Sequence, residues 1–150
     1  MGFRGRYGYR GGRGQGAGWG GGPPFMNVNL PSLQPPPQGG IRIAVATMDD
    51  KGLSSVIAPR FARAPFMTII DVVQGKVISV RPISNPFSQV PRGAGSGLGQ
   101  WLLSIGTSVV IGPHVGPNLG MILQQAGVRI ELVPPGTPVI YALRKLGIMV

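Results

Sequence analysis

Hydrophobic residues occur in short blocks from residue 41 onward, and the first three blocks predict strands. Residues 41–47, IRIAVAT, are typical of a strand buried on both faces. The segments FMTIIDVV at 66–73 and KVISVRPI at 76–83 are rich in β-branched residues and are separated only by Gln74 and Gly75. Such a two-residue connection predicts a β-hairpin.

The second half of the chain alternates helix-like and strand-like blocks. We predict a long irregular connection over 48–64 with one helical turn, a helix over about 97–105 stopped by Gly106, a strand over 107–112, a helix over about 117–126 and a strand over 128–133. A final helix is predicted with Thr137 as its N-cap and Pro138 at its first helical position. Arg144 and Lys145 then lie in its last turn, where cations are favourable.

This order of elements predicts an α/β domain. A strand, a hairpin and then helix–strand–helix–strand–helix give a mixed five-stranded sheet with helices on both faces. The first strand and the two later strands are expected to be parallel. Their neighbouring loops, 48–65, 84–96 and 112–117, should therefore lie at one edge of the sheet, where open α/β sheets bind ligands.

The first 40 residues differ in composition from the rest. Residues 1–22 are dominated by Gly with Arg and aromatic residues interleaved, so we predict a disordered tail. Residues 23–40 are Pro-rich and predict an extended linker with few buried contacts. The folded domain is accordingly assigned to residues 41–150.

The net charge of +10, from fourteen Lys and Arg against four acidic residues, indicates an anionic partner. The tail contributes four of the arginines, Arg4, Arg6, Arg10 and Arg13. The chain has no cysteine, which excludes disulfides and thiolate metal sites and fits a cytoplasmic protein. No apolar run approaches the roughly 20 residues of a membrane span, so no membrane association is expected.

Two glycine-rich turns, each followed by a helix-like segment, are the main candidate for a binding site. They are RGAGSGLGQWLLSIG at 92–106 and VVIGPHVGPNLGMILQQAG at 109–127. Unpaired amides and the helix dipole favour anions at such helix starts. The candidate ligand-binding residues are Arg60, Arg63, Arg92, Gly93, Gly95, His114, Gly116 and Asn118. The alternative is that the glycines serve only tight turns and helix packing.

Two long segments resemble the dinitrogenase iron-molybdenum cofactor biosynthesis family. They are IRIAVATMDDKGLSSVIAPRFARAPFMTIIDV and GAGSGLGQWLLSIGTSVVIGPHVGPNLGMILQQAGVRI, and the similarity covers about 41–146. The resemblance implies a ribonuclease H-like fold. It also implies binding or carriage of iron–sulfur–metal precursors, such as an iron–sulfur or iron–molybdenum-type cluster. The implied partners are proteins that donate or accept the cluster.

The chain departs from the family at two positions. Members of the family often have histidine where this chain has Arg60 and Arg92. A guanidinium group cannot coordinate a metal at ordinary pH, so these residues are expected to hold negative charge instead. His114 is left as the one candidate metal ligand.

The four acidic residues do not indicate an enzyme. A two-metal nuclease needs carboxylates that converge on two metal ions. Asp49 and Asp50 are adjacent in a loop, and we interpret them, together with Asp71 and Glu131, as turn and surface residues. One histidine also leaves no convincing Ser–His–Asp arrangement. The sequence therefore predicts a non-catalytic carrier for an anionic metal–sulfur species or an oxyanion such as molybdate.

Two other classes of function stay open. The Arg-Gly tail carries Phe3, Tyr7, Tyr9 and Trp19, and such segments bind RNA or single-stranded DNA weakly through phosphate contacts and base stacking. The domain is alternatively a structural or regulatory interaction domain without a ligand.

Overall fold

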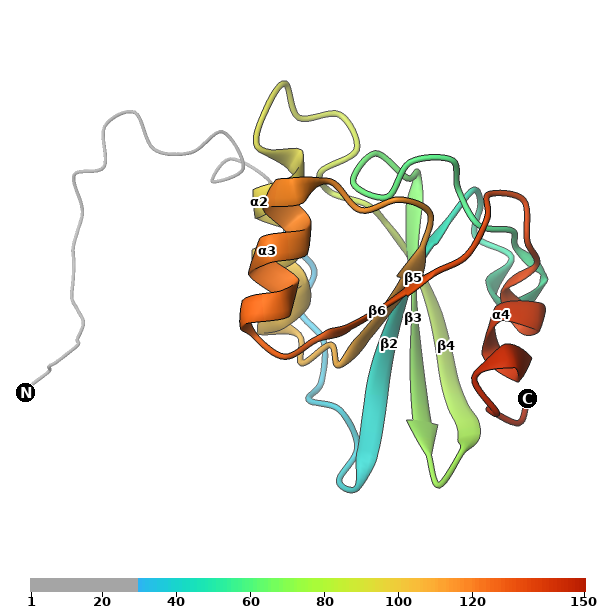
Figure 1. The fold of residues 1–150 in the computed structure, drawn as a ribbon. Coiled ribbons are helices and arrows are strands. Elements are labelled where there is room, and N and C mark those ends of the chain that lie inside the picture. The colour runs from blue at the N-terminus through green and yellow to red at the C-terminus, as the bar shows by residue number, and fades with distance from the viewer. Residues whose placement is uncertain (1–29) are drawn as a thin grey trace, which may run out of the picture.

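The computed structural model describes residues 30–150, which form one five-stranded sheet with three α-helices (Figure 1). The strands are β2 (Gly40–Thr47), β3 (Phe66–Val73), β4 (Lys76–Ser84), β5 (Val109–Gly112) and β6 (Arg129–Leu132). The helices are the 3-10 turn η2 (Gly52–Ser54), α2 (Ala94–Ser104), α3 (Pro117–Gln125) and α4 (Val139–Lys145). The predicted tail, 1–22, and the first part of the predicted linker lie outside the described residues.

The sheet is mixed, as the order of elements predicted. Its strand order is β4-β3-β2-β5-β6, in which β3 is antiparallel to both neighbours and β2, β5 and β6 are parallel. Gln74 and Gly75 join β3 to β4 with φ values of 52° and 76°. A turn with two successive left-handed residues matches the twist of paired strands, which confirms the hairpin.

Helices cover both faces of the sheet because side chains alternate along its central strands (Figure 1). Ala44 and Ile69 face the side of α2 and α3, in a cluster that includes Leu98. Ile43 faces the opposite side, in a second cluster with Leu143 of α4. The predicted placement of helices on both faces is therefore confirmed.

Two predicted helix starts are wrong by a few residues. Helix α2 begins at Ala94 rather than 97, after Gly93, whose φ of 79° is left-handed. Helix α4 begins at Val139, and its N-cap is Pro138 rather than Thr137. The reason is tertiary: the Thr137 carbonyl accepts a hydrogen bond of 2.9 Å from the Ile57 amide, which keeps Thr137 in an extended connection.

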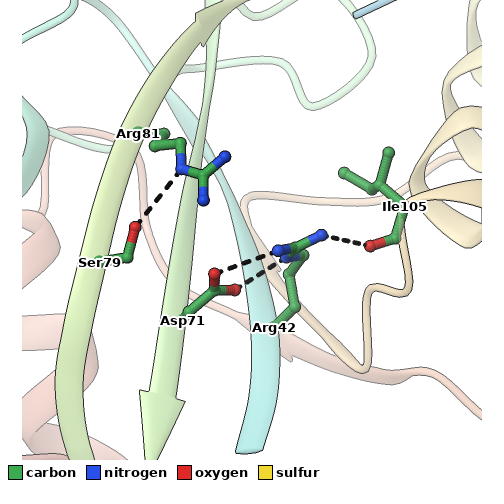
Figure 2. Close-up of polar contacts among 5 residues, drawn as sticks. All are labelled: Arg42, Asp71, Ser79, Arg81 and Ile105. Carbon is green, nitrogen blue, oxygen red and sulfur yellow. Dashed lines mark hydrogen bonds and ion pairs between the residues drawn. The ribbon is translucent and has the colours of Figure 1, made fainter. Parts of the chain in front are cut away.

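A buried ion pair joins β2 to β3, and it corrects the interpretation of Asp71 as a surface residue. Arg42 is 0% exposed and Asp71 is 4% exposed. The Arg42 guanidinium donates to both carboxylate oxygens, with Nε–Oδ1 at 2.8 Å and Nη2–Oδ2 at 3.1 Å (Figure 2). Its Nη1 donates to the Ile105 carbonyl at the end of α2, at 2.6 Å. One side chain thus ties two strands to a helix.

The described part of the linker packs against the domain, which contradicts the expectation of few buried contacts. Leu33 packs against the cluster beneath α2. The Trp101 indole donates to the Pro31 carbonyl at 3.2 Å. Pro36 lies so close to Gly106 that an added Cβ there would be 2.6 Å from the proline ring. The segment has no regular secondary structure, so its contacts come from side chains that the tertiary fold presents.

Deleting residues 1–38 should lower the thermal midpoint by several degrees relative to deleting residues 1–29, because only the longer deletion uncovers Trp101 and removes Leu33. A loss of about 1–2 kcal/mol in the free energy of unfolding lowers the thermal midpoint by several degrees in a domain of about 100 residues. Trp101 is the only tryptophan in both variants, so its fluorescence should also shift to the red. Identical midpoints and spectra would show that the contacts of residues 30–38 contribute nothing to stability.

Candidate functional site at the loop edge

The loops that carry the candidate residues leave one edge of the sheet. Strands β2, β5 and β6 are parallel and end there, whereas β3 begins there and β4 ends there. The connections 48–65, 85–93, 113–116 and 133–138 therefore meet at this edge, at the top of Figure 1. The strand directions confirm the predicted clustering of loops.

Helices α2 and α3 both begin at this edge with glycine N-caps and without a side-chain cap. The first intrahelical bonds are Gly97 N–H to the Gly93 carbonyl and Gly120 N–H to the Gly116 carbonyl, each 2.9 Å. Neither first turn contains an acidic residue. Both helix starts therefore present partial positive charge without a competing carboxylate of their own.

The glycines of α2 allow α3 to approach closely. A Cβ at Gly95 would lie 3.5 Å from the Cβ of Leu119. A Cβ at Gly99 would lie 3.0 Å from Leu119 Cδ1 and 3.1 Å from Ile122 Cγ2. Helix packing is therefore a sufficient reason for these two glycines, and it brings the two helix starts side by side.

Arg63 and Asn85 fasten the loop before β3 to the loop after β4. Arg63 Nη1 donates to the carbonyls of Val90, at 2.5 Å, and Ser88, at 3.3 Å. Asn85 Nδ2 donates to the carbonyls of Ala62, at 3.0 Å, and Ala64, at 2.9 Å. Arg63 is predicted as a ligand-binding residue, and its described contacts fix the loops that carry Arg60 and Arg92.

Of the remaining candidates, Gly95 and Gly116 are partly buried and the others are exposed. His114 lies beside two hollows that Arg92 does not line. His114 and Leu132 line two hollows, of about 270 Å³ and about 360 Å³. The first is completed by residues 113 and 133–135, and the second by Val115 and by residues of α3 and β6. Arg92 lines neither hollow. Arg60, Arg92 and Asn118 are exposed to solvent.

The Asp49 side chain stabilises the turn in which it lies, as interpreted from the sequence. Its Oδ1 accepts a hydrogen bond from the Lys51 amide at 3.1 Å. A side-chain hydrogen bond with Ser55 and this amide bond hold the pKa of the Asp49 carboxyl below its usual value. Within residues 30–150, no three His, Asp or Glu side chains form a group able to hold a metal ion.

Sequence reasoning missed Phe61, which locks the loop before β3 onto the end of β5. The Phe61 ring is 2% exposed and lies over Gly112. A Cβ at Gly112 would be 2.4 Å from Phe61 Cδ2, so only glycine fits there. The available signal was a glycine at the end of a buried strand, where a close approach is common.

The comparisons with known proteins agree with this fold. Residues 40–147 match the model of the family described as dinitrogenase iron-molybdenum cofactor, and the chain belongs to that family. A search of curated proteins gives no significant match. No helix among residues 30–150 has the length and hydrophobicity to cross a membrane.

Two solved structures are similar over most of the domain. One is the apo form of the orange protein from Desulfovibrio gigas, with 28% identity and a TM-score of 0.62, covering 70% of this chain and 85% of that one. The other is a putative NifB protein from Thermotoga, with 30% identity and a TM-score of 0.55, covering 71% of this chain and 86% of that one. Family and neighbours together indicate a role connected with a cofactor.

Proposed function

We propose that this protein is a non-catalytic carrier that binds an anionic metal–sulfur cluster precursor, or a related oxyanion, at the loop edge. The observation that carries the proposal is the pair of adjacent helix starts, each uncapped by a side chain and free of acids in its first turn. Family membership supports this class of ligand. The strand order supports the ribonuclease H-like description, and the absence of cysteine supports a cytoplasmic setting.

The donor set favours charge and hydrogen bonding over direct coordination. The chain contains no cysteine and one histidine, so a cluster would have a single imidazole ligand, His114. Arg92 and Arg60 would balance the negative charge, and amides near Gly93, Gly95, Gly116 and Asn118 would donate to the anion. Arg63 would act through the loops that it holds. Such a site binds its cargo loosely, which suits transfer between a donor and an acceptor protein.

Arg92→Ala should weaken binding of molybdate and of tetrathiomolybdate several-fold, because the protein loses a positive charge beside the start of α2. Binding is measured by calorimetry at low salt. Arg144→Ala is the matched control, since it removes the same charge at the C-terminal end of α4, away from the loop edge. Equal losses in both variants would indicate general attraction to a basic protein and would contradict the assigned site.

His114→Ala should abolish retention of a cluster reconstituted anaerobically, measured as metal and sulfide per chain. Molybdate binding should change less, because an oxyanion needs no imidazole ligand. Full loading of the variant with cluster would show that His114 is not a ligand. It would not contradict the proposed anion site.

The competing class of function rests on the tail. Its four arginines occur without any acidic residue in the first 22 positions, which suits binding to nucleic acid. A chain that starts at Leu30 separates the two proposals: it should lose salt-sensitive RNA binding and keep anion binding at the domain.

A further inference from the structure

Strand β6 forms an edge of the sheet whose outer side has no partner among residues 30–150. It pairs with β5 alone. The Arg129 amide donates to the Ser108 carbonyl at 3.0 Å, and the Val133 amide donates to the Gly112 carbonyl at 2.8 Å. Odd-numbered residues of β6 therefore direct their main-chain groups toward β5. The amides and carbonyls of Ile130 and Leu132 point to the open side.

The opposite edge of the sheet, β4, is protected in two ways. Pro82, two residues before the end of that strand, has no amide to offer a partner strand. At the start of β4, Met149 forms a parallel bridge with Lys76. The Val77 amide donates to the Met149 carbonyl at 3.0 Å, and the Met149 amide donates to the Gly75 carbonyl at 2.7 Å. Natural proteins block edge strands in this manner. Strand β6 contains no proline and has no such covering segment in the described chain.

Apolar side chains accompany the open edge of β6. Leu132 is 60% exposed, which is unusual for a leucine in a strand. Together with Ile130 it lines the hollow of about 360 Å³ between β6 and α3. A partner strand along this edge would therefore cover apolar surface as well as satisfy main-chain groups.

The charges on β6 are complementary to a reversed copy of the same strand. Its sequence is Arg-Ile-Glu-Leu, and Arg129 and Glu131 lie on one face, with Nε–Oε1 at 3.2 Å. In an antiparallel pair related by a two-fold axis at Ile130, Arg129 lies opposite Glu131 of the second copy, and the reverse pair forms as well. Opposite charges directly across an antiparallel pair are stabilising.

We propose that two copies of this chain associate through antiparallel pairing of their β6 strands, with the two-fold axis at Ile130. The two Ile130 residues then exchange both main-chain hydrogen bonds, which matches the outward direction of their amides and carbonyls. The competing register, centred on Glu131, also uses outward groups but places the two Glu131 carboxylates opposite each other. Charge therefore selects the register at Ile130.

The interface is small, because only four residues of each copy form the strand. Stable complexes usually bury about 1,200–2,000 Å² in total, and this pairing buries less. We therefore expect a weak, concentration-dependent dimer. Sedimentation equilibrium of the full chain, from micromolar to millimolar concentration, measures it.

Charge exchange tests both the surface and the register. Arg129→Glu and Glu131→Arg should each weaken the self-association of the full chain at least several-fold, because each variant opposes like charges in both cross-strand pairs. An equimolar mixture of the two variants should form a heterodimer, since each acidic pair then faces a basic pair. The double variant R129E/E131R should associate like the unchanged chain. Arg81→Glu on β4 is the control and should leave self-association unchanged.

Three results would overturn the proposal. One is a full chain that stays monomeric at millimolar concentration. Another is a dimer that persists in both single variants, which would place the interface elsewhere. The third is dimerisation only after residues 1–29 are removed, which would show that the tail and not a second copy covers β6 in the full chain. Circular dichroism of each variant confirms that the monomer remains folded.

Discussion

Asp71→Ala should lower the free energy of unfolding by about 3–5 kcal/mol, which is the usual cost of leaving one member of a buried ion pair without its partner. Arg42 would keep its charge and its bond to the Ile105 carbonyl but would lose both carboxylate contacts. No water reaches a guanidinium that is 0% exposed, so solvent cannot replace them. Urea denaturation measures the loss.

Two variants separate the buried pair from a general effect of charge. Arg81→Ala removes an arginine on β4 whose bond to Ser79 is exposed, and it should change stability by less than about 0.5 kcal/mol (Figure 2). The double variant R42M/D71L should recover much of the stability, because apolar replacement of both partners leaves no buried charge. An Asp71→Ala protein as stable as the unchanged chain would mean that the pair contributes nothing.

Gly112→Ala should destabilise the domain by about 1–3 kcal/mol, because the new methyl group overlaps a ring that cannot withdraw. The added Cβ would be 2.4 Å from Phe61 Cδ2 and 3.4 Å from the Cβ of Ala46. Either the end of β5 or the loop that carries Phe61 must move. Since that loop also carries Arg60, affinity for molybdate should fall together with stability.

Gly116→Ala is the matched control, because a Cβ there meets nothing within 4 Å and the φ of −64° suits alanine. It should leave the unfolding midpoint nearly unchanged. In the background of Phe61→Ala, the substitution Gly112→Ala should cost far less than it does alone, since the clashing ring is gone. Equal costs in the two backgrounds would assign the effect of Gly112→Ala to the strand itself.

The local pattern of hydrophobic, glycine and proline residues was sufficient to predict most of the helices and strands. The run at 66–73 is a strand with the predicted bounds, and the turn at Gln74 and Gly75 adopts the left-handed pair that a hairpin needs. The parallel strands and the loop edge followed from the order of elements, because crossover connections have a fixed hand. Two helix starts were predicted wrongly. Helix α2 begins at Ala94 rather than at 97. At the start of α4, a hydrogen bond between Thr137 and Ile57 overrides the capping preference.

The sequence predicted the edge where the loops meet, but it did not predict the contacts that the candidate residues make there. The sequence located Arg60, Arg92 and His114 near the ends of strands, which depends only on neighbouring residues. The contacts of Arg63 with Val90 and Ser88 depend on loops separated by more than twenty residues. The hollows beside His114 likewise depend on β6 and α3 together.

The sequence by itself determined the class of fold, the order of the elements, the positive charge and the absence of cysteine ligands, because each follows from local pattern or from composition. Only the tertiary structure decided that Arg42 and Asp71 are buried together, that residues 31–36 pack on α2, and that Phe61 lies on Gly112. These are contacts between distant segments. Their partners are selected by shape and by the need to satisfy buried polar groups, which no single segment reveals.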